Sequence, residues 1–132
     1  MRAMLQKMWP IALCGVLLFV LGCATTRTRK IDAPERMQTE IGALIHPGMT
    51  IEEVESAMKI EGFKCTIERN ASFVSMKSWL DMEPRRDAID FVRCNRTNSA
   101  GLMMERVWSV AIMLDGEKTT GEVLVSHYVD GP

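Results

Sequence analysis

The segment TIEEVESAMKIEGFKCTIE, residues 50–68, passes from a helical to a strand pattern of apolar residues. Its first half carries four apolar residues at the spacing of one helix face: Ile51, Val54, Ala57 and Met58. Thr50 with Glu53 three residues later is a capping box, and Gly62 is a favoured helix terminator. Its second half alternates three apolar residues with polar ones: Phe63, Cys65 and Ile67. The segment therefore predicts a helix followed by a strand with one solvent-exposed face.

An earlier helix is predicted over residues 34–45. Pro34 is favoured in the first turn of a helix, and Glu35 complements the helix dipole there. Four apolar residues share one face of this helix: Met37, Ile41, Leu44 and Ile45. Residues 46–48 (His-Pro-Gly) end it, so a tight turn leads to the helix that begins after Thr50.

Three later segments have strand character: residues 88–96, 102–114 and 122–129. Turn signals separate them at 97–101 and at 115–118, and Gly121 is assigned to the second turn region. Residues 70–87 fit either a short strand or a loop. A sheet with one apolar face must be covered, and the two helices are the candidates for this role. The order predicts an α+β fold in two layers, with two N-terminal helices packed on a three- to four-stranded antiparallel sheet.

The composition fits one small globular domain without a nucleic-acid partner. The 132 residues contain 16 Lys and Arg and 17 Asp and Glu, which gives a formal net charge of −1. A nucleic-acid binder is normally clearly basic. The chain is also too rich in apolar residues, at 47%, for a disordered protein.

The N-terminus has the pattern of an export signal. Arg2 and Lys7 precede an apolar run over residues 11–21, which is shorter than the roughly 20 residues that span a bilayer. The run ends in Val20-Leu-Gly-Cys23, which resembles a bacterial lipobox. Alternatives are an uncleaved anchor or an ordinary secretory signal.

The lipobox resemblance implies cleavage between Gly22 and Cys23. Cys23 would then carry a diacylglycerol thioether and an N-terminal acyl chain such as palmitate. Ala24 follows the cysteine, where Asp is absent, and in Gram-negative lipoproteins this implies export to the outer membrane with the domain facing the periplasm. The expected division is a signal peptide over 1–22, a lipidated flexible tether over 23–33, and one domain over 34–132.

Two cysteines, Cys65 and Cys94, remain for the exported domain. Disulfides persist in such compartments, and we expect these two residues to pair. In the chain-entropy estimate the closed loop stabilises the domain by roughly 3.5 kcal/mol. Two independent buried thiols are the alternative. No zinc-type spacing joins the cysteines to His46 or His127, so no metal site is expected.

The phrase Pro47-Gly-Met-Thr-Ile-Glu-Glu-Val54 resembles the SmpA/OmlA (BamE-like) lipoproteins, which place it at the start of their second helix. The resemblance implies a helix–helix–sheet fold and a role in outer-membrane assembly. The same architecture occurs in β-lactamase-inhibitory-protein-like domains, where the sheet and loops bind a partner protein. The chain departs from the family after Gly62, because no Gly-x-Pro turn follows.

The sequence contains no recognisable catalytic motif, so we expect a non-enzymatic lipoprotein without a cofactor, which binds an envelope protein or maintains the envelope. Candidate partner-binding residues are Trp79, Arg85 and Arg86, since Trp and Arg are over-represented in binding hot spots. Core packing of Trp79 and solvation of the arginines are the alternatives. His127 is expected to be a satisfied, partly buried residue. Other readings are an inhibitor or immunity-type module that uses loop 81–84, and a lipid- or small-molecule-binding protein.

Overall fold

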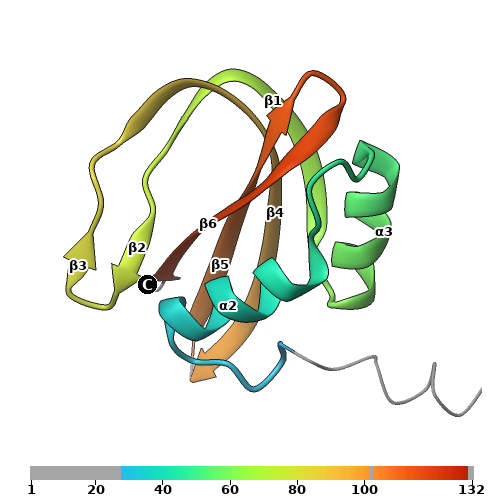
Figure 1. Ribbon diagram of the computed structural model, residues 1–132. Coiled ribbons are helices and arrows are strands. Elements are labelled where there is room, and N and C mark those ends of the chain that lie inside the picture. Colours follow the sequence, from blue (N-terminus) through green and yellow to red (C-terminus); the bar gives the residue numbers. More distant parts are fainter. Residues whose placement is uncertain (1–27, 102, 131–132) are drawn as a thin grey trace, which may run out of the picture.

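The computed structural model describes residues 28–101 and 103–130 (Figure 1). Its elements are helices α2 (Pro34–Leu44) and α3 (Ile51–Ile60) and strands β1 (Lys64–Phe73), β2 (Met76–Ser78), β3 (Asp81–Met82), β4 (Arg86–Gly101), β5 (Met104–Asp115) and β6 (Lys118–Asp130). Four strands form an antiparallel sheet in the order β1-β4-β5-β6, and β2 pairs with β3 in a small second sheet. The predicted α+β class with an antiparallel sheet is confirmed.

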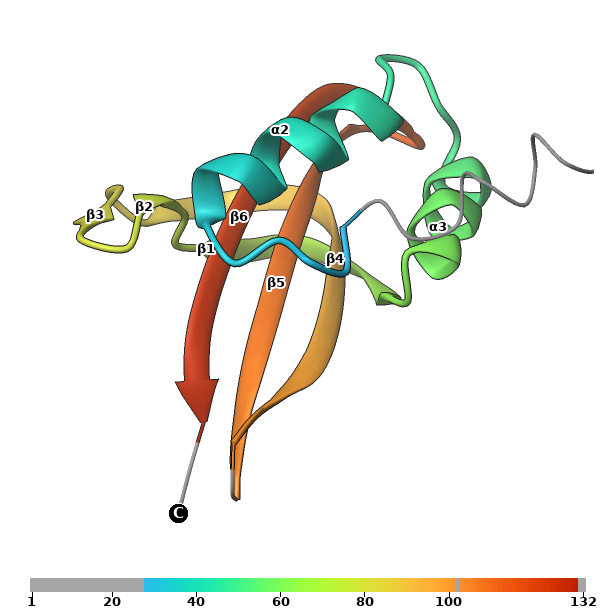
Figure 2. The ribbon, with the colours of Figure 1, turned by 90° about the horizontal axis from the view of Figure 1, so that it is seen from below.

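The two helices begin and end close to the predicted positions. The Thr50 hydroxyl accepts a hydrogen bond from the Glu53 backbone N–H at 3.2 Å, which caps α3. Gly62, with a φ of +85°, turns the chain from α3 into β1. In α2, Pro34 occupies the first turn and no side chain caps the helix. Figure 2 shows α2 lying over β5 and β6, with α3 beside the sheet.

The main core joins residues of both helices to one face of the sheet. Its fully buried members come from α2, α3, β4, β5 and β6: Met37, Ile41, Val54, Met58, Val92, Cys94, Val110, Ile112 and Val125. A second apolar cluster holds side chains of alternate strand positions: Phe73, Phe91, Ala111, Met113 and Leu124. Because side chains alternate between the faces of a strand, this cluster lies on the opposite face. The α2 side chain of Gln38 also donates a hydrogen bond to the Val123 carbonyl at 2.9 Å.

The predicted disulfide lies between the first two strands of the sheet. Cys65 and Cys94 stand opposite each other in the register of β1 and β4, with their Cα atoms 4.0 Å apart, and their sulfurs are bonded. Cys94 is buried in the main core and Cys65 packs against it. The cross-link therefore joins neighbouring strands within the core.

Two strand boundaries differ from the sequence prediction. Residues 97–101 were predicted as a turn, but they continue β4 and pair with β5 as far as Gly101 opposite Met104. Gly121 was predicted in a turn, but it lies within β6 at a φ of +90°. The β5–β6 register shifts between Ile112 and Leu114, and a glycine can absorb such a bulge because it adopts positive φ without strain.

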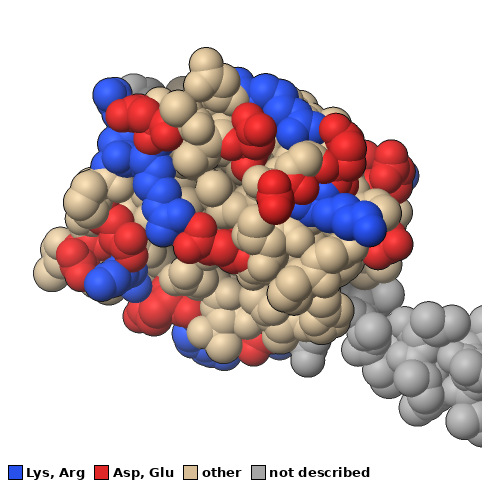
Figure 3. Space-filling model, turned by 45° about the horizontal axis from the view of Figure 1, so that its top comes forward, with Lys and Arg blue, Asp and Glu red and all other residues tan. Residues whose placement is uncertain are grey.

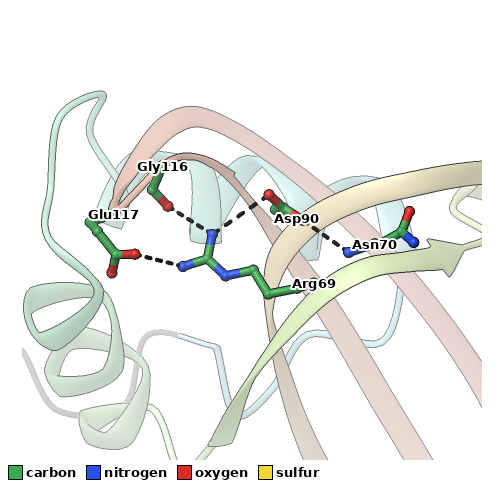
Figure 4. A network of polar contacts seen from close by, with 5 residues as sticks. All are labelled: Arg69, Asn70, Asp90, Gly116 and Glu117. Atoms are coloured by element: carbon green, nitrogen blue, oxygen red, sulfur yellow. Dashed lines mark hydrogen bonds and ion pairs between the residues drawn. The ribbon is translucent and has the colours of Figure 1, made fainter.

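Strand β1 also extends beyond the predicted segment, because a polar network holds its far end (Figure 4). Arg69 donates to the Gly116 carbonyl and to Glu117, both at 2.9 Å, and lies 3.6 Å from Asp90. The same carboxylate accepts a hydrogen bond from the Asn70 backbone N–H at 2.9 Å, where φ is +50°. These contacts fix the bend of β1 and β4 against the β5–β6 turn.

The end of the predicted tether is folded onto the domain. Thr28 and Ile31 are buried, and Ile31 belongs to the main core. The predicted signal peptide and the proposed cleavage site at Gly22 and Cys23 lie outside the described residues. Among residues 28–101 and 103–130, no helix has the length and apolar character needed to cross a bilayer.

Candidate interaction site

Residues 74–85, called the hairpin arm below, connect β1 to β4 and carry β2 and β3. The sequence prediction left this region as either strand or loop, and the structure makes it a short hairpin that turns at Trp79 and Leu80. In Figure 1 the upper ends of β1 and β4 curve over and descend to β2 and β3. The arm therefore contacts β6 and α2 from outside the four-stranded sheet.

The turn of the hairpin arm exposes three large apolar side chains. Leu80 is 98% exposed, Met82 is 63% exposed and Trp79 is 46% exposed. On the face shown in Figure 3, acidic and basic side chains are interspersed. A group of neighbouring apolar side chains at a protruding turn is typical of a protein-binding surface rather than of a solvated loop.

The base of the hairpin arm is fixed to β6. Arg86 donates hydrogen bonds to both carboxylate oxygens of Glu122, at 2.6 and 3.3 Å, and this contact raises the Arg86 pKa. The Glu83 backbone N–H donates to the Ser75 carbonyl at 2.9 Å within the arm. The Met76 sulfur accepts a hydrogen bond from a backbone N–H of β6, that of His127, at 3.4 Å.

His127 sits between two indole rings, with Trp79 of the arm on one side and Trp108 of β5 on the other. Its ring centroid lies 4.4 Å from that of Trp79 and 4.0 Å from that of Trp108, both edge-on. The His127 side chain is only 3% exposed, and neither ring nitrogen has a hydrogen-bond partner among the described residues. The prediction of a satisfied, partly buried histidine is therefore wrong. Burial, with a smaller contribution from Arg106, lowers the His127 pKa.

The three predicted partner-binding residues occupy different environments. Trp79 is half exposed at the turn of the arm, so it is neither wholly a core residue nor free of contacts. Arg85 is exposed and lies 2.9 Å from Asp87, whose pKa is lowered by a hydrogen bond from Ser72 and, to a smaller extent, by Arg85. Arg86 forms an ion pair with Glu122. Trp79 is thus available at the surface, whereas Arg86 positions the hairpin arm.

Leu80 was not chosen from the sequence, and Met82 was included only as part of loop 81–84 in the inhibitor reading. The available signal was the run Trp79-Leu-Asp-Met82, in which apolar residues flank a turn-forming aspartate. Sequence patterns show that such a turn exists, but they do not show that its apolar residues point outward. That depends on how the arm lies against β6.

A polar groove of about 220 Å³ runs beside the base of the arm, between residues 72–74 and the sheet. Its charged side chain, Arg93, donates to Glu68 at 2.7 Å and lies over the rings of Phe73 and Phe91, at 5.4 and 5.2 Å from their centroids. Arg93 is therefore occupied by contacts within the domain. The groove is a weaker candidate than the exposed turn of the arm.

Within the described part of the chain, no group of three or more His, Cys, Asp or Glu residues could hold a metal ion. No family model, no curated protein and no solved structure matches this chain.

Proposed function

We propose that this protein is an outer-membrane lipoprotein, anchored through acylated Cys23, whose periplasmic domain binds another envelope protein. The lipobox sequence Val20–Cys23 supports the anchor, and Ala24 supports the outer membrane as its destination. The binding role is non-enzymatic and needs no cofactor. The helix–helix–sheet order, with helices and sheet sharing one core, is consistent with the SmpA/OmlA-like arrangement, and a role in outer-membrane assembly is the more specific form of the proposal.

The observation that carries the binding role is the exposure of Leu80 beside Trp79 and Met82 on a braced turn. Burying an apolar side chain of this size contributes about 1.5–3 kcal/mol, which a protein partner with an apolar recess can supply. The Arg86–Glu122 ion pair already orders the base of the arm. Less conformational entropy is then lost on binding than with an unconstrained loop. Trp79 adds the residue type that is most enriched in hot spots.

An inhibitor or immunity-type module is the second candidate, because the same arm carries the predicted acidic loop residues Asp81 and Glu83. An arm of this kind can enter the cleft of an exported enzyme. The two proposals differ in the identity of the partner, and the same cross-linking experiment separates them.

A photo-crosslinking amino acid in place of Met82, in the full precursor expressed in its own envelope, tests the binding role. We expect one dominant cross-linked protein, and we expect the Leu80→Ser variant to lower its yield strongly. The matched control is Ile67→Ser, which removes an exposed aliphatic side chain from β1. Equal yields in the two variants, or cross-links to abundant porins alone, would contradict the proposal.

The anchor is tested separately. The Cys23→Ala variant should lose both fatty-acid labelling and membrane fractionation, whereas Cys65→Ala should keep both. A Cys23→Ala protein that still takes up labelled fatty acid would overturn the lipid assignment.

A further inference from the structure

Arg96 is a buried arginine that holds the start of the described chain. Its guanidinium donates to the Thr28 hydroxyl at 2.7 Å, to the Thr28 carbonyl at 3.0 Å and to the Glu61 carbonyl at 2.9 Å. The ring of Phe63 lies beneath it, with the ring centroid 4.7 Å from Cζ. The contacts thus join Thr28, the α3–β1 turn and β4 at one corner of the domain.

Burying a charged guanidinium is energetically costly unless hydrogen bonds compensate for the lost hydration. Arg96 is 7% exposed, and its burial lowers its pKa. Two of its three hydrogen-bond acceptors belong to Thr28, which is itself fully buried. The hydrogen bonds of Arg96 to Thr28 and to the Glu61 carbonyl are called the Arg96 clamp. The Thr28 carbonyl also accepts a hydrogen bond from the Ile31 backbone N–H at 3.2 Å, which connects the clamp to the core. The contacts of Arg96 therefore serve mainly to fix the chain before α2.

The position of Thr28 limits how far this corner can lie from the proposed anchor. Five residue steps separate Cys23 from Thr28. At about 3.3–3.6 Å per residue, a fully extended chain of this length reaches roughly 18 Å. If Thr28 is fixed to the corner, the corner must stay within this distance of the lipidated cysteine. Without the clamp, the next buried residue is Ile31, which allows a longer reach.

The exposed charges at this corner are mainly basic. Four exposed basic residues flank the clamp, two directly after Thr28 and two around the α3–β1 turn: Arg29, Lys30, Lys59 and Lys64. The acid within that turn, Glu61, is buried, and both of its carboxylate oxygens lack a hydrogen-bond partner among the described residues. Asp32, Glu55 and Glu68 are the acidic side chains nearest in sequence that reach the surface, and Glu68 is paired with Arg93. The corner therefore presents an excess of positive charge.

We propose that the Arg96 clamp orients the domain on its own membrane, with the α3–β1 corner facing anionic lipid headgroups. This inference rests on the lipid anchor proposed above. Lys and Arg side chains near a membrane surface are attracted to anionic headgroups over about a Debye length. The turn at the other end of α3, where Lys118 pairs with Thr50, then faces away from the bilayer. The hairpin arm, which carries Lys77, stays accessible to a protein partner.

The test uses the mature chain from Cys23 onward, coupled through the Cys23 thiol to a maleimide lipid in phosphatidylethanolamine–phosphatidylglycerol vesicles. Coupling is specific because Cys65 and Cys94 are joined in the disulfide. The measured quantity is the rate at which a water-soluble amine reagent modifies each lysine, read by mass spectrometry. Relative to the uncoupled protein, we expect Lys30, Lys59 and Lys64 to react severalfold more slowly. Lys77 and Lys118 should react at unchanged rates.

Two changes should remove this protection. Arg96→Gln releases Thr28, and its matched control is Arg106→Gln, which changes an exposed arginine of β5. Because Arg96→Gln can also destabilise the domain, the second change inserts ten Gly and Ser residues before Thr28 and leaves every contact intact. Vesicles of phosphatidylcholine alone should also give weaker protection than anionic ones.

Equal protection of all five lysines, or protection that survives the insertion, would overturn the proposed orientation. Because the maleimide lipid replaces the natural acyl groups, this result does not depend on native lipidation. The mass of Cys23 in protein isolated from cells tests the anchor itself. Failure of the orientation and failure of the anchor are thus distinguishable.

Discussion

Arg86, the first residue of β4, forms a two-point ion pair with Glu122 of β6, at 2.6 and 3.3 Å and across 36 residues of sequence. This contact closes the base of the hairpin arm against the far edge of the sheet. Both side chains are partly exposed, so we expect the pair to contribute at most about 1 kcal/mol to folding. Its larger effect is on the order of the arm.

Glu122→Gln should therefore loosen the arm without unfolding the domain. The expected result is severalfold faster amide hydrogen exchange over residues 76–83, with a free energy of unfolding reduced by no more than about 1 kcal/mol. Hydrogen exchange with mass spectrometry measures both the site and the extent of the change. Glu105→Gln, an exposed carboxylate on β5, is the control. Unchanged exchange in the arm would show that Met76 and Trp79 hold it alone.

The disulfide between Cys65 and Cys94 should supply a large part of the stability of this small domain. The two residues are 29 apart in sequence, and closing a loop of this size stabilises the folded state by roughly 3.5 kcal/mol. Urea unfolding with and without a reductant should show a loss of this order. A double Cys65→Ala, Cys94→Ala variant should be destabilised to a similar extent and should not respond to the reductant. Identical unfolding midpoints for reduced and oxidised protein would refute the estimate.

Two glycines should respond oppositely to replacement by alanine. Gly121 has a φ of +90°, and a Cβ there would come within 2.7 Å of the Pro47 Cγ, so Gly121→Ala should destabilise the domain. Gly42 lies within α2 with no atom near its would-be Cβ, so Gly42→Ala should stabilise by up to about 1 kcal/mol. Thermal unfolding of the two variants compares them directly. A Gly121→Ala variant as stable as the parent would mean that the bulge in β6 can relax.

The sequence was informative where local chemistry decides the structure. The Thr50 cap, the Gly62 terminator and the start of the strand after it were correctly predicted because each depends on residues a few positions apart. The predicted alternation was wrong at Ile67, which is 48% exposed. The hairpin arm was not correctly predicted, because its orientation depends on contacts such as Arg86 with Glu122 across the sheet. The same holds for Arg96, whose strand pattern gave no sign that it would reach back to Thr28. Local patterns cannot show which distant residues meet.

His127 gives a pH dependence whose sign follows from its burial. Its folded-state pKa lies below the usual value of about 6.5, because the ring is buried and Arg106 is near. As the pH falls below about 6.5, the unfolded chain binds a proton on His127 before the folded protein does. Stability is therefore retained above this pH and falls as the pH decreases toward the folded-state pKa.

The His127→Phe variant isolates this effect. Phenylalanine keeps an aromatic ring between Trp79 and Trp108 and removes two ring nitrogens that have no hydrogen-bond partner among the described residues. Because an unsatisfied buried polar group costs about 1–3 kcal/mol, we expect this variant to be at least as stable as the parent at pH 7.5. Between pH 7.5 and 5.5 its urea midpoint should fall less than that of the parent. Equal pH dependence in the two proteins would mean that His127 is hydrogen-bonded or hydrated in solution, and that the loss of stability arises elsewhere.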